Sequence, residues 1–525
     1  MTALTLILLV ASAGYALARA TRLPIIPLLL VAGSALAALG WVERTPFVDD
    51  TFRLALTFLV FSAGMELNPD RFARHLKTVF WVGLTQFLGV AMAGFAIAGL
   101  LGFDVVSATY LGIALSTSST LVVVQHLKQQ QQMFEPFGRL VLGVLLVQDL
   151  LMILIIVVAG HWPQGVLAAL GGVGATAALA GVAVGCQRWL MPWFLRRCRP
   201  DEETLLLTVL ALLFAFMGAA VKLGISPIAG AFLAGFALAR FPVNGIARGQ
   251  LLSFNDFFQA IFFTALGGII TIPDGWLVAQ ALLFSAVVWG LTPPLVALVA
   301  EWRGLTARPA LEAGLLLAQT SELALVLGLT GAQMLGHIPG RVFSLIALVA
   351  VLTMTLTPLV ARDRVTTFLL RFHPLRRRRS AETPPRDHAL MLGFGAGGMW
   401  VLKPLRQAGH TVVVVDDDPA VITKLQHAGV PCVRGDGADE AVLERAGARQ
   451  ARVILAAMRR VEDAERVLRH AAGRPVLVRV FEEREAAAVR RLGGIPILNS
   501  IASADTFMEW FEKAMGPTAS PNSAA

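Results

Sequence analysis

The first two thirds of the chain consist of long apolar runs separated by short polar breaks. A helix needs roughly 20 predominantly apolar residues to cross the hydrocarbon core of a bilayer, and about thirteen runs approach that length. The pattern therefore predicts a polytopic α-helical membrane domain. The predicted spans are residues 3–19, 23–40, 51–66, 78–101, 106–127, 136–159, 164–187, 202–222, 225–240, 251–271, 276–299, 309–333 and 341–362.

Basic residues alternate between the loops that join these runs. Loops on the cytoplasmic side of a membrane protein carry an excess of Lys and Arg. The first loop and every second loop after it are the basic ones, which places the N-terminus outside. An odd number of spans then places the C-terminus in the cytoplasm, and the pattern predicts a multi-pass membrane protein. The predicted inside loops contain Arg19, Arg22, Arg71, Arg74, Lys77, Lys128, Arg139, Arg188, Arg196, Arg197, Arg199, Arg240, Arg248, Arg303 and Arg308.

Composition agrees with a membrane protein and argues against other classes. Hydrophobic residues make up 56% of the 525 positions and charged residues 15%, whereas about 25% of a soluble domain is charged. Much of the net charge of +9 lies in loops beside apolar runs and in RRRR at 376–379, which indicates contact with membrane lipid and not with nucleic acid. The three cysteines show neither CxxC nor CxxH spacing, so the sequence predicts no disulfide framework or zinc site.

The pattern changes to alternating short strands and helices after residue 388. The strand ALML leads into a GxGxxG motif, a helical stretch follows to about Gln407, and the strand TVVVV ends at Asp416. In dinucleotide-binding domains such glycines let a phosphate approach a helix N-terminus, and an acid about 20 residues further on binds a ribose hydroxyl. The sequence therefore predicts a Rossmann-like α/β domain with a nucleotide site. The candidate binding residues are Gly393, Gly395, Gly398, Asp416, Asp418 and Asp436.

These patterns divide the chain into four predicted parts. Residues 1–365 form the membrane domain, and residues 366–387 form a basic and then Pro-rich linker. Residues 388–515 form the nucleotide-binding domain. The tail at 516–525 is predicted to be disordered.

Two clusters of small hydroxyl residues interrupt the fifth and the twelfth predicted span. The first is LSTSST at 115–120 and the second is AQTSE at 318–322. Hydroxyl groups satisfy backbone groups where a membrane helix unwinds. Discontinuous helices in corresponding positions of two repeats mark the binding site of a transporter. We therefore expect two broken helices, although Ser and Thr that bond only to the preceding helical turn are the alternative.

An ionisable carboxylate, Asp149, lies in the apolar run LLVQDLLMILIIV at 145–157. A charged side chain at mid-span is costly and marks an ion or proton pathway by default. One carboxylate can hold either a proton or a metal cation, and this competition is sufficient to couple two opposite fluxes. A structural aspartate paired with a buried base is the alternative. Glu322 is a second intramembrane acid whose role the sequence leaves open, and Glu66 suits a structural role.

Several motifs together resemble those of one transporter family. FSAGMELNP, GIALSTSSTLVVVQHL, LVQDL, GISPIAGAFLAG and LAQTSELALVLG occur in order along the chain. They are similar to segments of the monovalent cation:proton antiporter-2 (CPA2) family, and the Gln148-Asp149 pair is similar to that of the Kef-type potassium/proton antiporters. GxGxxG, VVDDDP and GD resemble the regulatory RCK or Trk-N domain of potassium transport systems.

The resemblance implies inverted repeats with two crossing broken helices, a homodimer, and exchange of a monovalent cation for a proton. By matching position it implies that Asp149 is the exchanging carboxylate and binds the transported cation. It also implies that the C-terminal domain binds a regulatory nucleotide, namely NAD(H), AMP or ATP, and that a glutathione-type ligand is a candidate regulator. The ion and proton site that it implies comprises Asp149, Gln148, Thr117, Ser118, Ser119, Thr120, Ser321 and Glu322.

Two departures from the family refine this expectation. The family often has Gly-Glu-Phe where this chain has Ser321-Glu322-Leu323, and several electrogenic relatives carry a buried lysine in a span whose counterpart, 276–299, contains none. One acid without that lysine favours electroneutral exchange. The choice of potassium over sodium depends on the resemblance alone, so a sodium/proton antiporter is the nearest alternative.

Two other classes fit the sequence less well. A nucleotide-gated potassium channel needs a carbonyl filter of the TVGYG kind, which the chain lacks. A membrane-anchored NAD-dependent oxidoreductase needs a catalytic acid or base beside the dinucleotide, and no such grouping is evident. We therefore expect an antiporter and not an enzyme.

Overall fold

The computed structural model describes residues 2–21, 24–40, 46–66, 76–130, 132–133, 136–198, 201–239, 245–270, 273–361, 363–370, 386–394, 398–458, 461–471 and 473–498. Three predicted features lie outside the described residues, namely Gly395, most of the linker (371–385) and the tail (516–525). Contacts divide the chain into two compact units. The first is Met1–Arg303 with Pro309–Thr366, and the second is Gly304–Arg308 with Thr367–Ala525.

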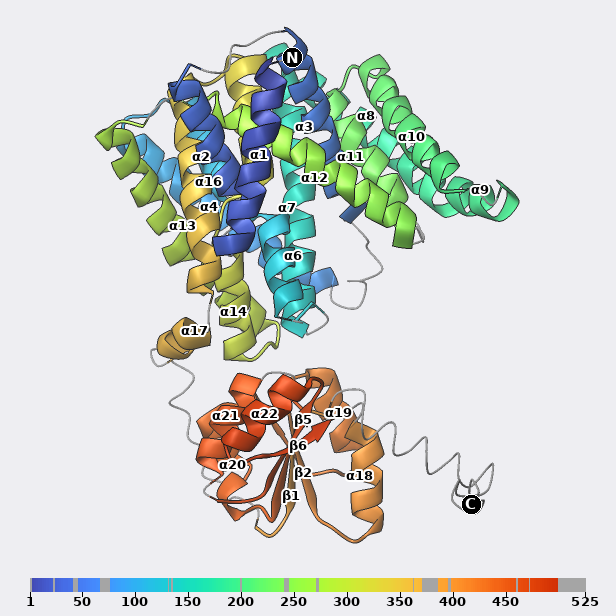
Figure 1. The fold of residues 1–525 in the computed structure, drawn as a ribbon, viewed down its shortest axis with the longest axis vertical. Coiled ribbons are helices and arrows are strands. Elements are labelled where there is room, and N and C mark those ends of the chain that lie inside the picture. The colour runs from blue at the N-terminus through green and yellow to red at the C-terminus, as the bar shows by residue number, and fades with distance from the viewer. Residues whose placement is uncertain are drawn as a thin grey trace, which may run out of the picture. The chain divides into compact units, whose positions relative to one another are not determined.

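The apolar part of the chain is entirely helical where it is described (Figure 1). Eight helical stretches are long and apolar enough to cross a membrane, and five shorter apolar helices accompany them among the described residues. Each predicted span corresponds to one helix or to a helix pair with a break. The helices are α1 (Thr2–Thr21), α2 (Ile25–Ala38), α3 (Pro46–Glu66), α4 (Leu76–Leu100), α5 (Val105–Leu115), α6 (Thr120–Gln129), α7 (Pro136–His161), α8 (Val166–Gly185), α9 (Met191–Cys198), α10 (Glu202–Lys222), α11 (Pro227–Leu238), α12 (Gly245–Gly267), α13 (Gly275–Trp302), α14 (Ala307–Leu317), α15 (Glu322–Leu329), α16 (Gly340–Val360) and α17 (Asp363–Leu370).

The seventh span extends further than the sequence predicts. The expected end is at residue 187, but α8 continues through a π-helical turn at Cys186–Leu190 into α9. The added part is amphipathic, with exposed Trp189 and Trp193 beside Arg196 and Arg197. Such aromatic and basic residues are typical of the membrane–water boundary, where apolar length alone does not mark the end of a helix.

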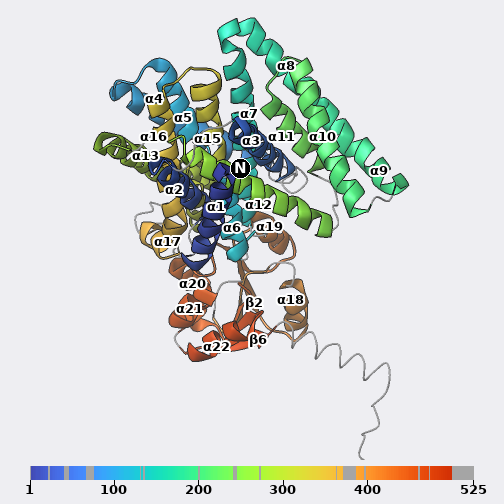
Figure 2. The same ribbon diagram turned by 45° about the horizontal axis from the view of Figure 1, so that its top comes forward.

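The order of helices repeats along the first unit. The series α2, α3, α4, broken α5–α6 and α7 is followed later by α11, α12, α13, broken α14–α15 and α16. Helices of the two series also pack on each other: α3 lies against α11, α2 lies against α12, and α4 lies against its counterpart α13. This arrangement agrees with the predicted repeats. Helices α8 and α10 lie outside the series and run side by side next to α11 in both views (Figures 1 and 2).

Glycines let the backbones of the paired helices touch. A Cβ atom built on Gly64 of α3 would lie 2.1 Å from the carbonyl oxygen of Phe232, and one on Gly235 of α11 would lie 2.0 Å from that of Phe61. The α2–α12 pair has the same feature at Gly33 and Gly267. Small residues at helix contacts allow this approach in membrane proteins, where packing replaces the hydrophobic effect.

The second unit contains one parallel sheet with the strand order β3-β2-β1-β4-β5-β6. This is the order of the dinucleotide-binding doubly wound fold. Helices α18 and α19 cover one face, and α20 to α22 cover the other (Figure 1). The polytopic helical domain and the Rossmann-like domain predicted from the sequence are both confirmed. The elements are β1 (Ala389–Leu392), α18 (Gly398–Gln407), β2 (Val412–Asp416), α19 (Pro419–His427), β3 (Cys432–Arg434), α20 (Glu440–Arg445), β4 (Val453–Ala456), α21 (Val461–His470), β5 (Val476–Val480), α22 (Glu483–Arg491) and β6 (Ile495–Leu498).

Candidate functional site

Both hydroxyl clusters lie at real breaks in the helices. The segment after α5 is non-helical until α6 begins, and the segment after α14 is non-helical until α15 begins. Each second half-helix starts with a serine cap: the Ser119 hydroxyl accepts from Val122 N at 3.3 Å, and the Ser321 hydroxyl accepts from Leu323 N at 3.1 Å. These caps satisfy backbone groups that the breaks expose inside an apolar domain.

The two breaks meet in the first unit through Ser118. Its hydroxyl donates to the carbonyl oxygen of Leu317, the last residue of α14, at 2.7 Å. Thr117 is buried beside it but directs its hydroxyl back to the Ala114 carbonyl at 3.5 Å. A hydrogen bond from one break to the other fixes their separation, so a displacement of one is transmitted to the other.

The side chains of Gln148 and Gln86 stabilise the first break by hydrogen bonds. Ser118 N donates to Gln148 Oε1 at 2.9 Å, Gln148 Nε2 donates to Gln86 Oε1 at 2.5 Å, and Gln86 Nε2 donates to the Ser116 carbonyl at 3.1 Å. All four residues are buried. Gln148 therefore supports the backbone of the break, which its place in the sequence did not reveal. Gln86 was not among the predicted site residues, although it is a polar residue in the middle of an apolar run.

Threonines of α16 hold the second break. The Thr353 hydroxyl accepts from Thr320 N at 3.0 Å, and the Thr357 hydroxyl donates to the Ala318 carbonyl at 2.8 Å. Residues four apart lie on one face of a helix, so the spacing of these threonines was the available signal. The sequence analysis missed both.

Asp149 lies beside the start of α6. Its side chain is almost wholly buried, at 3% exposure, and Oδ2 accepts from the Thr120 hydroxyl at 3.2 Å. Glu322, at the start of α15, is 6% exposed and lies close to the Ser119 side chain and the Leu121 backbone. The acid of the second break thus lies beside the first break, and the structure brings the predicted residues of both breaks into one buried region.

The atoms gathered here are oxygen ligands. Besides the Asp149 carboxylate, the buried atoms Gln319 Oε1, Thr320 Oγ1 and Glu322 Oε2 make no hydrogen bond to any part of the chain that the structure describes. Carboxylate, hydroxyl and carbonyl oxygens replace the hydration shell of an alkali cation, and unwound backbone coordinates such ions in transporters. The region therefore suits either a monovalent cation or a proton.

We predict that Gln86→Leu impairs exchange without touching a charged group. The leucine leaves Gln148 Nε2 and the Ser116 carbonyl without their partners, and each buried orphan costs about 1–3 kcal/mol. The thermal midpoint of the purified protein should fall by several degrees, and proton flux in proteoliposomes should drop by roughly tenfold. Gln280→Leu is the matched control, because Gln280 is buried on α13, the counterpart of α4. Equal flux in Gln86→Leu and the control would show that the glutamine pair does not support the break.

In the second unit Asp416 is the last residue of β2, and its side chain reaches the turn after β1. Asp416 Oδ2 accepts from Phe394 N at 2.7 Å and Oδ1 accepts from Asp418 N at 2.9 Å. Gly393 directly follows β1 and has φ +80°, a conformation that favours glycine. Gly398 begins α18, as the fingerprint requires. Asp416 thus ties the ends of β1 and β2 together, at the place where the fingerprint puts the acid that binds a ribose hydroxyl.

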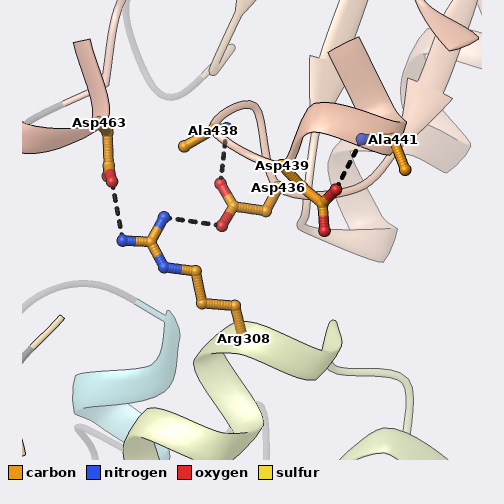
Figure 3. Close-up of polar contacts among 6 residues, drawn as sticks. All are labelled: Arg308, Asp436, Ala438, Asp439, Ala441 and Asp463. Atoms are coloured by element: carbon orange, nitrogen blue, oxygen red, sulfur yellow. Dashed lines mark hydrogen bonds and ion pairs between the residues drawn. The ribbon is translucent and has the colours of Figure 1, made fainter. Parts of the chain in front are cut away.

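Asp436, the remaining candidate, is engaged by a distant residue of the same unit. Its Oδ1 accepts from Ala438 N at 2.9 Å, and its Oδ2 accepts from Arg308 Nη1 at 2.9 Å (Figure 3). Arg308 Nη2 donates to Asp463 Oδ1 at 2.8 Å. In the sequence Arg308 is one of many basic loop residues, and Asp463 was not predicted as a site residue. These two contacts join residues that are 128 and 155 positions apart, so no local sequence pattern predicts them.

Asp417 stands out electrostatically at the same edge. Burial, and then the charges of Asp416, Asp436 and Asp418, raise its pKa to about 7 from an ordinary value of 3.8. The folded domain therefore holds a proton here that the unfolded chain releases above pH 4. The free energy of unfolding must fall as the pH rises from about 4 to about 7, and the penalty is complete above that window.

We predict that Asp417→Asn stabilises the protein, and more so at higher pH. The neutral amide removes a buried charge at pH 8, with an expected gain of about 2 kcal/mol and little change at pH 4. Thermal unfolding of the purified full-length protein at pH 5, 6.5 and 8 measures the difference in midpoint between variant and wild type. Asp439→Asn is the control, since asparagine also caps α20 where Asp439 accepts from Ala441 N. A difference that stays constant with pH would contradict the raised pKa.

Comparison with known proteins agrees with both parts of this description. Residues 6–362 match the family described as "Sodium/hydrogen exchanger, transmembrane", and residues 389–500 match the "TrkA-N domain". The chain therefore belongs to the sodium/hydrogen exchanger family. It is a CPA2-type antiporter of the Kef kind with a C-terminal TrkA-N domain, which confirms the resemblance seen in the sequence.

Individual relatives cover most of the chain at low identity. The protein named "Putative cation/proton antiporter YbaL" of Escherichia coli K12 is 27% identical over 436 residues, which is 78% of this chain and 77% of that one. The "Glutathione-regulated potassium-efflux system protein KefC" of Enterobacter sp. 638 is 26% identical over 447 residues, which is 82% of this chain and 70% of that one. The solved sodium proton antiporter MjNhaP1 of Methanocaldococcus jannaschii has a TM-score of 0.56 at 15% identity, covering 70% of this chain and 97% of that one, and it supports the fold alone.

Proposed function

We propose that this antiporter exchanges potassium for protons, one for one, at Asp149. The observation that carries the proposal is a buried carboxylate beside two helix breaks that are bonded to each other. The potassium assignment is supported by the KefC relative, whose name describes potassium efflux. Sodium is the second candidate, and the family description supports it.

The mechanism follows from competition for one group. Asp149 binds a cation when it is ionised and a proton when it is not, so arrival of one releases the other. The Thr120 hydroxyl orients the carboxylate, and Gln148 keeps the backbone of the first break in place. Rocking of one group of helices against the other would expose Asp149 to each side in turn.

Electroneutral exchange follows if a single carboxylate is the carrier. One positive charge crosses in each direction, so no net charge moves. No lysine or arginine occurs in residues 276–299, the predicted span whose counterpart carries a lysine in several electrogenic relatives. Glu322 lies beside the first break, and we assign it a structural role there.

The C-terminal domain is proposed to regulate this exchange by binding a nucleotide. The support is the TrkA-N match, the strand order and the placement of Gly393, Gly398 and Asp416 at the carboxyl edge of the sheet. NAD(H), AMP and ATP are the candidates, and a glutathione-type ligand is a further candidate. A dimer in the inner membrane, with the N-terminus outside and the nucleotide domain in the cytoplasm, completes the proposal.

Proton flux in proteoliposomes tests the exchange and its stoichiometry. Purified protein is reconstituted with an internal pH indicator, and potassium, sodium or choline is added outside. Potassium should drive proton flux, choline should not, and clamping the membrane voltage at different values should leave the flux unchanged. Flux with sodium alone would replace the potassium assignment. A flux that varies with voltage would contradict one-for-one exchange.

A further inference from the structure

A buried arginine, Arg308, joins the start of α14 and the residues just before it to the second unit. Gly304–Arg308 belongs to that unit by its contacts. Arg308 is only 6% exposed, and its two terminal nitrogens bind different carboxylates, Asp436 and Asp463 (Figure 3). Arg434 on β3 also donates to the Gly304 carbonyl. A guanidinium held at both ends is fixed in position and orientation, because its donors form a rigid fork.

Both carboxylates lie near the edge of the sheet where a nucleotide is expected. Asp436 follows β3, and Asp463 lies in the first turn of α21, which follows β4. Ligands of open parallel sheets bind beyond the carboxyl ends of the strands. Asp436 also contributes to the raised pKa of Asp417 at that edge. Arg308 therefore offsets negative charge beside the candidate nucleotide site.

The chain connects Arg308 directly to the second break. Arg308 is the second residue of α14, an uninterrupted helix of 11 residues. Such a helix is about 16 Å long and moves as one piece. Its last residue, Leu317, accepts the hydrogen bond from Ser118. A shift at Arg308 along the helix axis thus reaches the bond that joins the two breaks.

We propose that Arg308 is a positioning residue that couples occupancy of the nucleotide site to the geometry of the second break. This inference rests on the proposed function and names the route by which the nucleotide acts. A bound nucleotide adds anionic phosphate near Asp436 and Asp463, and the Arg308 guanidinium offsets that charge. Nucleotide binding and engagement of Arg308 therefore favour each other. Because coupling is reciprocal, loss of Arg308 weakens nucleotide binding by the factor with which the nucleotide strengthens the engagement of Arg308.

The test uses the full-length protein with NAD⁺, NADH, AMP and ATP. Nucleotide affinity is measured by titration in detergent, and the exchange rate is measured in proteoliposomes with and without each nucleotide. In Arg308→Gln the affinity should fall by at least about fivefold, and the ratio of the two exchange rates should fall to one. Arg308→Lys keeps the charge but lacks the rigid planar fork that fixes the side chain between two carboxylates, so it should recover affinity in part and leave the response absent. Arg469→Gln on α21 is the control, since its ion pair with Glu465 is exposed.

Four results would contradict the coupling through Arg308 or the proposed function. A normal nucleotide response in Arg308→Gln overturns the proposal. If that variant is not recovered in folded form, Asp463→Ala removes one arm of the contact and leaves Asp436 intact. A normal nucleotide response in Asp463→Ala would also overturn the proposal. Wild-type protein that exchanges ions but responds to none of the four nucleotides also overturns the coupling, while the exchange function stands. Wild-type protein that binds nucleotide but shows no cation-driven proton flux contradicts the proposed function itself.

Discussion

We expect proton flux driven by potassium to fall to the level of protein-free liposomes in Asp149→Asn. The amide has nearly the same shape as the carboxylate but neither binds a cation by charge nor releases a proton. A carboxylate and a cation about 4 Å apart interact by roughly 4 kcal/mol at an effective dielectric constant of 20. Loss of that interaction lowers cation affinity at least about a hundredfold. The measurement is the initial rate of proton flux at several potassium concentrations.

The matched control is Asp104→Asn. Asp104 caps α5, the first half of the same broken helix, where it accepts from Val106 N and Ser107 N at 3.1 Å. Asparagine caps helices equally well, so exchange should remain near the wild-type rate. Glu322→Gln separates the two intramembrane acids. Exchange that survives in Asp149→Asn and is lost in Glu322→Gln would transfer the site to Glu322.

The second large effect concerns Gly235, which lies where α11 crosses α3. A methyl group there would lie 2.0 Å from the Phe61 carbonyl oxygen and 2.9 Å from Met65 N. Both are backbone atoms, so no side chain can move aside and the helices must separate. Overpacking of this kind costs about 3 kcal/mol. We expect Gly235→Ala to lower the thermal midpoint of the detergent-purified protein by several degrees and to reduce the folded yield.

Gly218→Ala provides the comparison for that substitution. Gly218 lies in α10, which packs against α11, and a Cβ atom there meets nothing within 4 Å. Alanine also stabilises a helix interior relative to glycine, so the midpoint should stay constant or rise. If Gly235→Ala and Gly218→Ala have the same thermal midpoint, the close approach of α3 and α11 does not limit stability.

The features that the sequence reveals are those set by local chemistry. Apolar length defines a span and the glycine fingerprint defines the start of the nucleotide domain, so both parts of the fold are predictable. The breaks are also visible, because LSTSST and AQTSE place hydroxyl groups where a helix must end and begin again. The π-turn that carries α8 on into α9 is less visible, because an amphipathic end of a helix lacks the apolar signal.

The features that the sequence conceals depend on contacts between distant residues. Gln148 looks like a neutral neighbour of Asp149, yet it bonds to Ser118 N and to Gln86, 62 residues away. Arg308 has the appearance of one more positive residue in an inside loop. Its burial between Asp436 and Asp463 arises from tertiary packing, and no spacing in the sequence encodes it.

Proton release on cation binding tests the central claim most directly. Potassium chloride is added to detergent-purified protein in a weakly buffered solution with a pH indicator, and choline chloride serves as the blank. If a potassium ion and a proton compete for Asp149, the wild type releases protons as potassium binds, and Asp149→Asn releases none. Equal proton release by the wild type and Asp149→Asn would contradict the account, because the exchanged proton would then reside on another group.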